Sequence, residues 1–264
     1  MDNMRYVAFL DILGFSQLVE NSSHTHEQIA NKMADIFQCS ILSALRGKQV
    51  IVEKIPNLNI SNKIKILQFS DSVILFTKGD SQVDFNNMVL CLNYLLAQAL
   101  VRGYPLRGGL SIGQLYYKHP ILVSDGLIKA YRFEGKQAWS GVIIDRICYE
   151  RENIDLQKVI EPRKLVSYED VPIKSDHSDC LDKHEKHYVI NWPLFIGERM
   201  PSEKEIVDNF SQNNDSPRDS KAEIILQETV RFGLKNMGYE YLPTFKYNET
   251  GKKVLLLVRT ELSE

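Results

Sequence analysis

Two short apolar segments of this sequence end at an aspartate, and this pattern constrains the fold more than any other feature. The run 6–10 leads into Asp11, and the segment 64–69 is followed by Asp71 in a polar turn and by a second apolar run. Dense apolar runs of this length indicate buried strands, and a short polar interruption between two of them indicates a hairpin. A carboxylate beside such strands is costly unless it is paired or binds a metal.

The rest of the pattern predicts an α+β fold. The first half reads as strand, helix, hairpin, helix, strand, helix, which is the order of a ferredoxin-like βαββαβ core with helices on an antiparallel sheet. In that order the first strand lies beside the hairpin, so both aspartates are expected at one edge of the sheet. The expected helices are 27–45, 85–102 and 124–134, the long strand is 106–117, and 142–147 is either helix or strand.

Two units are expected, a core over 1–150 and a C-terminal α/β extension over 151–264 that completes or packs on it. The extension has a weaker pattern than the core. Segment 47–62 is expected to be a loop or a short hairpin, and segment 211–220 is polar enough to be a loop. In the extension we expect strands at 159–166 and 188–195 and helices at 202–210 and 221–235.

Glycines interrupt the strand 106–117 at Gly108, Gly109 and Gly113. Glycine weakens a strand interior, so its presence there indicates close approach of a ligand or a neighbouring element. The strand is therefore expected to lie under something that leaves no room for side chains.

Composition excludes several classes of protein. The chain has 32 basic and 34 acidic side chains and a formal net charge of −2, which argues against a protein that coats nucleic acid or an anionic membrane. Four cysteines without a CxxC motif indicate free thiols in a reducing compartment. With no signal-peptide pattern and no apolar stretch long enough to span a membrane, a cytoplasmic location is expected.

The two aspartates admit two interpretations. Each alone suits a helix cap or a turn. Together, at one sheet edge, they suit a divalent cation, because Mg²⁺ is commonly held by one or two carboxylates and substrate phosphates. Gly14, Phe15 and Ser16 follow at a helix start, where backbone N–H groups could face a triphosphate.

Four segments, taken in order, resemble the signatures of class III nucleotidyl cyclases: 9–16, 69–72, 106–113 and 124–134. The opening Phe-Leu-Asp-Ile-Leu-Gly-Phe-Ser is most similar to that of the pyrimidine cyclases of bacterial Pycsar antiphage systems. The four segments cover more than half of the chain, and their order is more specific than any one of them.

The resemblance implies a set of site residues. Asp11 and Asp71 would bind two Mg²⁺ or Mn²⁺ ions, with the carbonyl of Ile12 as a further ligand, and Arg132 would be the transition-state arginine. The reaction would be attack of a ribose 3′-oxygen on the α-phosphate with loss of pyrophosphate. Class III cyclases share their sites between two subunits, so a homodimer is implied.

The chain departs from the purine cyclases at several positions. Ser70 replaces the hairpin glycine, Ile128 stands at the ribose-binding asparagine, and Leu67 and Ile121 stand at the purine-reading pair. The spacing between Asp11 and Asp71 is longer than usual for the family. Three explanations stay open, namely a pyrimidine cyclase, a catalytically dead nucleotide-binding module, and a purine cyclase with a rearranged base pocket.

The favoured interpretation is a cyclase that converts UTP or CTP to a cyclic nucleotide in antiphage defence. The product would activate a separate effector, with no nucleic acid or membrane as partner. Gln68 and Arg107 are polar groups on the expected strands and could read a pyrimidine edge. The alternative is a half-exposed strand position for Gln68 and a salt bridge for Arg107.

A histidine-rich stretch carries residue types that suit zinc. Its spacing matches no standard zinc site, and the surrounding sequence is heavily charged, so a solvated loop is the preferred interpretation. The residues concerned are His177, Cys180, His184 and His187.

Overall fold

The structure is a computed structural model that describes residues 3–21, 24–46, 63–169, 171–174, 186–195, 220–237, 241–247 and 253–259. The predicted loop 47–62, the predicted helix 202–210 and nearly all of the predicted loop 211–220 lie outside these residues. So do His177, Cys180 and His184 of the histidine-rich stretch.

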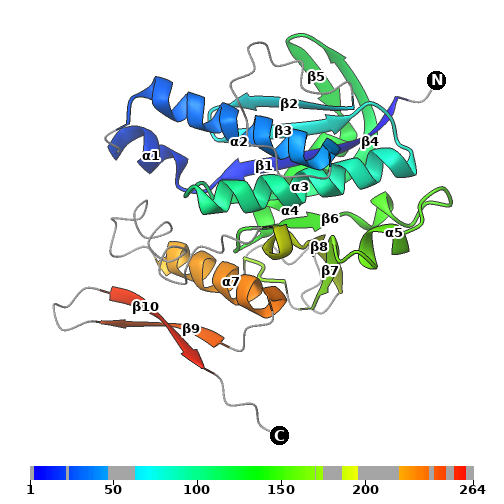
Figure 1. The fold of residues 1–264 in the computed structure, drawn as a ribbon. Helices are drawn as coiled ribbons and strands as arrows, with labels where there is room; N and C mark the ends of the chain where they lie inside the picture. The colour runs from blue at the N-terminus through cyan, green and yellow to red at the C-terminus, as the bar shows by residue number, and fades with distance from the viewer. Residues whose placement is uncertain are drawn as a thin grey trace, which may run out of the picture.

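The described part of the chain is built on a mixed eight-stranded sheet (Figure 1). The strand order is β2-β3-β1-β4-β6-β8-β7, and β5 pairs with the far part of β4. The α+β class is therefore confirmed, and the first strand lies beside the hairpin as expected. The strands are β1 (Met4–Ile12), β2 (Ile64–Phe69), β3 (Ser72–Thr77), β4 (Leu106–Lys118), β5 (Ile121–Ser124), β6 (Val142–Ile144), β7 (Leu165–Tyr168) and β8 (His187–Ile190).

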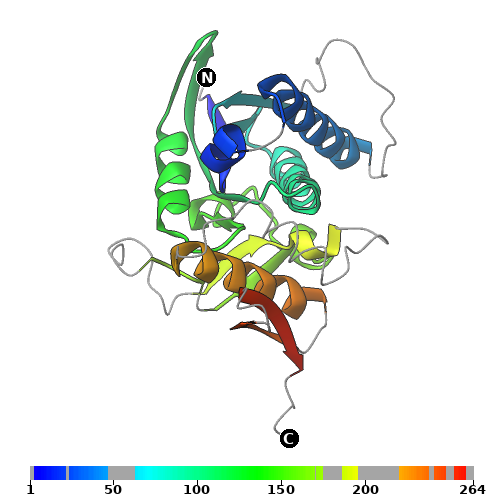
Figure 2. The same cartoon turned by 90° about the vertical axis from the view of Figure 1, so that its left-hand side faces the viewer.

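Helices cover both faces of the sheet (Figure 2). The long helices α2 (His26–Arg46) and α3 (Gln82–Val101) pack on one face, and α4 (Asp125–Lys136) packs on the other. The expectation of an antiparallel sheet was thus wrong in one detail, because β6 runs parallel to β4. The reason is that α4 crosses from the end of β5 back along the sheet, which returns the chain in the direction of β4.

The two faces have separate apolar cores. The larger core lies under α2 and α3, where Tyr6, Ala8 and Leu10 of β1 are completely buried. The smaller core lies on the face that carries α4 and includes Val7 and Ile74. Successive residues of β1 thus point to opposite faces, as the alternation of a strand requires.

The strand glycines are explained by a neighbouring element. A β-carbon at Gly109 would lie 2.5 Å from the carbonyl oxygen of Ala130, and one at Gly113 would meet Asp125, both in α4. At Gly108 a β-carbon would meet the backbone of Phe9 in β1. The expected close approach is confirmed, and it is made by α4 and β1.

The C-terminal part begins by extending the same sheet. The segment 142–147, left open between helix and strand, is β6 followed by the 3₁₀ turn η1 (Arg146–Cys148). The predicted strands 159–166 and 188–195 are shorter and shifted, because α5 (Gln157–Ile160) precedes β7 and η2 (Trp192–Phe195) follows β8.

The last described elements are α7 (Ser220–Met237), which was predicted, and the hairpin of β9 (Tyr241–Tyr247) and β10 (Lys253–Arg259), which was not. Phe232 of α7 packs against Trp139, with 4.6 Å between the ring centroids. This contact ties α7 to the core. No helix among the described residues is long and apolar enough to cross a membrane.

Candidate functional site

The structure brings the two aspartates together at one edge of the sheet. Asp11 pairs in register with Ser72, the residue after Asp71. The backbone N–H of Ile12 donates to the carbonyl oxygen of Asp71 at 2.9 Å, which holds the turn of the hairpin against the end of β1. The predicted juxtaposition of Asp11 and Asp71 is therefore confirmed.

The backbone around this edge adopts two left-handed conformations. Ser70 has φ of 54°, and Gly14, just after β1, has φ of 78°. A left-handed conformation suits glycine and strains other residues. Ser70 thus occupies a position that favours glycine.

A buried ion pair stands next to Asp11. Arg107 is directly opposite Asp11 on β4, and its Nη2 lies 3.5 Å from Asp11 Oδ2. The same guanidinium binds Glu134 of α4 more closely, with Nη2 at 2.5 Å and Nε at 2.8 Å from Oε1. The Arg107 side chain is 11% exposed and that of Glu134 is 8% exposed, so the pair is shielded from water.

Sequence reasoning missed Glu134 as part of this site. The available signal was its position four residues after Ala130, which places both on one face of the predicted helix. Ala130 is completely buried, so that face was the one turned to the sheet. A carboxylate on it required a cation from a strand, and Arg107 was the cation on the adjacent strand.

The carboxylates outweigh the cations around Asp11. The pKa of Asp11 is raised to about 6, chiefly by burial and also by the nearby charges of Glu134 and Asp71, against the opposing effect of Arg107 and Lys174. Three carboxylates therefore face two cations. Such a surplus of negative charge in a partly buried site favours a further cation.

These groups fit a hard divalent cation. Carboxylate and carbonyl oxygens are its preferred ligands, and Asp11, Asp71 and the Ile12 carbonyl come from adjoining backbone. Within the described residues no three His, Cys, Asp or Glu side chains form a metal-binding group. Two carboxylates are enough where substrate phosphates and waters supply the remaining ligands.

Two other predicted elements of the site lie on either side of this cluster. Phe15 and Ser16 begin α1 (Phe15–Asn21), directly after the turn at Gly14. Arg132 is exposed on α4, and the neighbouring Tyr131 packs edge-on against Phe9 of β1 at 5.2 Å between ring centroids. Among the described residues of one chain, Arg132 forms no hydrogen bond or ion pair with Asp11, Asp71 or Glu134.

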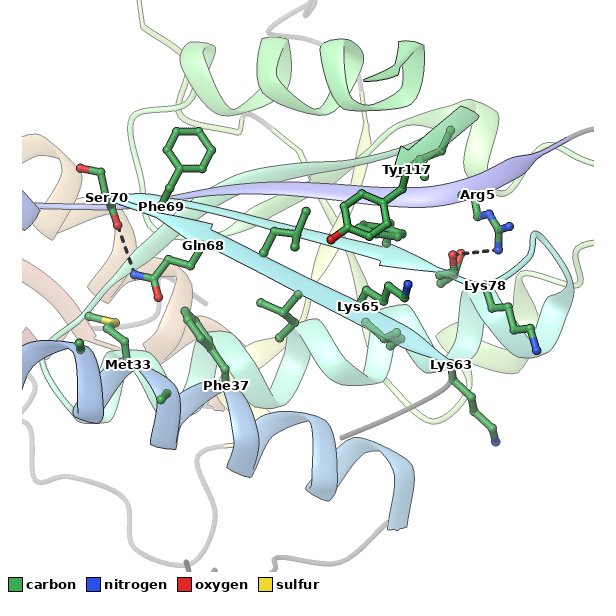
Figure 3. A pocket seen from close by; sticks show the side chains of 18 of the residues that line it. Arg5, Met33, Phe37, Lys63, Lys65, Gln68, Phe69, Ser70, Lys78 and Tyr117 are labelled. Atoms are coloured by element: carbon green, nitrogen blue, oxygen red, sulfur yellow. Dashed lines mark hydrogen bonds between the residues drawn. The ribbon is translucent and has the colours of Figure 1, made fainter. Parts of the chain in front are cut away.

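The two residues expected to read the base do not come together. Leu67 packs with the core on the α4 face, so its neighbour Gln68 points to the opposite face, toward α2 (Figure 3). The Gln68 amide donates to the Ser70 carbonyl at 3.2 Å. The physical reason is strand alternation, which separates Gln68 from Arg107 on the other face.

Comparison with known proteins adds no relative. No family model matches the chain, and no curated protein matches it.

Proposed function

We propose that this chain is a pyrimidine nucleotide cyclase that converts UTP or CTP to the 3′,5′-cyclic nucleotide and pyrophosphate. The observation that carries the proposal is the meeting of Asp11 and Asp71 at one sheet edge, in segments that resemble cyclase signatures. The order of strands and helices through β6 is compatible with the ferredoxin-like cyclase core.

Asp11, Asp71 and the Ile12 carbonyl would hold Mg²⁺ or Mn²⁺. When bound, the ions supply positive charge at the triphosphate and lower the pKa of the ribose 3′-hydroxyl. Arg107, which is itself held by Glu134 of α4, keeps the Asp11 carboxylate in place from the side of β4. The backbone of Gly14, Phe15 and Ser16 lies next to this edge, where the triphosphate would extend.

The position of Arg132 supports a site shared between two copies. Arg132 is exposed on α4, beside Ile128 and Tyr131, which are 55% and 57% exposed. Further exposed apolar side chains lie on β2 and on the β4–β5 hairpin, and such surfaces mark association sites. In a homodimer, Arg132 of the second copy would meet the α-phosphate held at Asp11 and Asp71. The further exposed residues are Phe69, Tyr116, Ile121 and Val123.

The residues at the purine-reading positions support a pyrimidine substrate. Leu67 and the exposed Ile121 occupy the positions where purine cyclases place their purine-reading polar pair, and neither side chain can form a hydrogen bond with a purine. The cyclic product would act as a second messenger in antiphage defence, in the cytoplasm, by switching on a separate effector.

A second candidate is a nucleotide-binding module without catalysis. It is favoured by the contact of Arg107 with Asp11, because this cation competes with a metal ion for the same carboxylate. The close pairing of Arg107 with Glu134 weighs against it, since Glu134 holds the guanidinium and leaves Asp11 the longer contact.

The test is pyrophosphate release by the purified chain with Mn²⁺ and each of ATP, GTP, CTP and UTP. We expect release from one pyrimidine triphosphate, a 3′,5′-cyclic product by mass spectrometry, and loss of release in Asp71→Ala. Release from a purine triphosphate would select the rearranged purine cyclase. Metal-dependent nucleotide binding without release would select the binding module.

Mixing two inactive variants tests the shared site. Asp71→Ala and Arg132→Ala homodimers should both be inactive. After subunit exchange at equal amounts, half of the dimers are mixed and one of their two sites is intact, so about a quarter of wild-type activity should return. Mixing Asp71→Ala with Asp11→Ala is the control, and it should restore nothing because both changes affect the same half-site.

A further inference from the structure

A groove of about 1190 Å³ runs along the edge strand β2 (Figure 3). Every residue from Lys63 to Ser70 lines it, because the groove wraps around the outer edge of the strand. Met33 and Phe37 of α2 form part of one apolar wall, and Tyr116 and Tyr117 of β4 form part of the other.

Four cations gather at the end of this groove that is farther from Asp71: Arg5, Lys63, Lys65 and Lys78. Arg5 and Lys65 lie in β1 and β2, while Lys63 directly precedes β2 and Lys78 directly follows β3. The pairing of Val7 with Phe76 carries Arg5 to the position opposite Lys78, and the N–H of Lys78 donates to the Lys63 carbonyl at 3.0 Å. Like charges opposite one another on neighbouring strands are destabilising, so this row works against the stability of the sheet.

No carboxylate lies among the described residues that line the groove. The chain as a whole has 34 acidic and 32 basic side chains, so a basic surface is not its general character. The ion pairs found in the described part of the chain do not include Arg5, Lys65 or Lys78. The positive charge of the cluster is thus local.

Two of the cations are oriented by neutral groups. Lys65 Nζ lies 5.0 Å from the centre of the Tyr117 ring, within range of a cation–π interaction. Arg5 Nη1 donates to the Thr77 carbonyl at 3.3 Å. These contacts hold the side chains in place and leave their charge available to a ligand.

We propose that this end of the groove binds a phosphate-bearing small molecule with at least two negative charges. The ligand is free pyrophosphate or the phosphate chain of a nucleotide, whose base could lie on Tyr117 of β4. Arg5 is six residues from Asp11 along β1, or about 20 Å at the usual rise of a strand. The groove is therefore a second anion site, and it does not depend on the proposed cyclase activity.

Isothermal titration of the full chain in EDTA, first with pyrophosphate and then with UTP and ATP, tests this proposal. EDTA removes the contribution of divalent ions at Asp11 and Asp71. We expect saturable binding that weakens as salt increases. The double variant Lys65→Gln/Lys78→Gln should bind at least about tenfold more weakly, because each charged hydrogen bond to phosphate contributes about that factor.

Matched controls separate this site from others. Lys129→Gln/Lys158→Gln removes the same charge outside the groove and should leave binding unchanged. A nucleotide that binds more tightly than pyrophosphate, and loses that advantage in Tyr117→Leu, identifies the nucleotide as the ligand; equal binding identifies the free diphosphate group. The proposal is overturned if no anion binds at millimolar concentration, or if the groove variant, with a melting temperature no lower than that of the wild type, binds as the wild type does.

Discussion

The two ends of the sheet face that carries α4 differ in whether their charged side chains are paired. At the Asp11 end, Arg107 and Glu134 are almost fully buried and paired with each other. At the other end, Lys65 and Lys78 are exposed, and no described carboxylate is paired with them. The difference follows from burial. A buried charge is costly unless another group of the protein pairs with it, whereas an exposed charge is solvated by water and remains available to a ligand.

The largest expected effect comes from breaking the buried pair. Arg107→Met should lower the free energy of unfolding by about 3–5 kcal/mol, because it leaves Glu134 buried without a partner. The double variant Arg107→Met/Glu134→Leu should recover most of this loss. Urea denaturation measures both.

The more exposed pair of Arg151 and Asp80, at 2.6 Å, gives the matched control. Arg151→Met should cost no more than about 1 kcal/mol. If Arg107→Met costs no more than Arg151→Met does, the contrast between buried and exposed charges is wrong.

The second effect concerns Asp11 and depends on pH. Its pKa is about 6 in the folded chain and about 3.9 in an unfolded one, so the fold binds the proton more tightly and loses stability as pH rises between those values. The Asp11→Asn variant has no carboxylate to ionise, so its stability does not fall in this way. Its free energy of unfolding should exceed that of the wild type by about 1–3 kcal/mol at pH 7.5 and differ little at pH 4.

Denaturation in EDTA at both pH values measures the Asp11 effect. Asp80→Asn, which removes a paired carboxylate, should show no gain at neutral pH. A constant difference between Asp11→Asn and the wild type across this pH range would contradict the assignment of a raised pKa.

A smaller effect is expected at the hairpin turn. Ser70→Gly should stabilise the fold by about 1 kcal/mol, because glycine adopts the left-handed conformation of this position without strain. Ser72→Gly, in extended strand, should instead destabilise by about 0.5–1 kcal/mol. The melting temperatures of the two variants should change in opposite directions. A change in the same direction would contradict the inference that the backbone is strained at Ser70.

The smallest effect is expected at the basic end. Lys78→Gln should raise the free energy of unfolding by a few tenths of a kcal/mol, because it relieves repulsion across the strands. The measurement is a melt at low salt, where the gain should be larger than at high salt. A loss of stability at low salt would mean that Lys78 is paired, and the basic end would then resemble the acidic one.

The sequence was most informative where apolar runs are bounded by polar turns. The hairpin strands at 64–69 and 72–77 were predicted almost to the residue, because both are apolar and flanked by polar turns. Asp11 and Asp71 could be paired in advance because each follows such a strand. The C-terminal hairpin of β9 and β10 was missed, since Pro243 and the mixed composition of β9 give no clear alternation.

The remaining errors arise from contacts that no local pattern contains. Gln68 was grouped with Arg107, although a shift of one residue along a strand moves a side chain to the other face. Glu134 was overlooked because its partner Arg107 is 27 residues away in the chain. The parallel pairing of β6 with β4 depends on where α4 lies, and that is set by the glycines of β4.

The absent side chain of Gly109 has a consequence for the site. Ala130 rests on β4 at this glycine, and Glu134 stands one helical turn farther along α4. The distance between α4 and the sheet therefore sets how closely the Glu134 carboxylate approaches Arg107. It thereby also sets how strongly the Arg107 guanidinium interacts with Asp11. A single added methyl group at Gly109 would move α4 away from the sheet and change the contacts among Asp11, Arg107 and Glu134. The affinity of this site for cations is thus governed by a residue that would touch neither metal nor nucleotide.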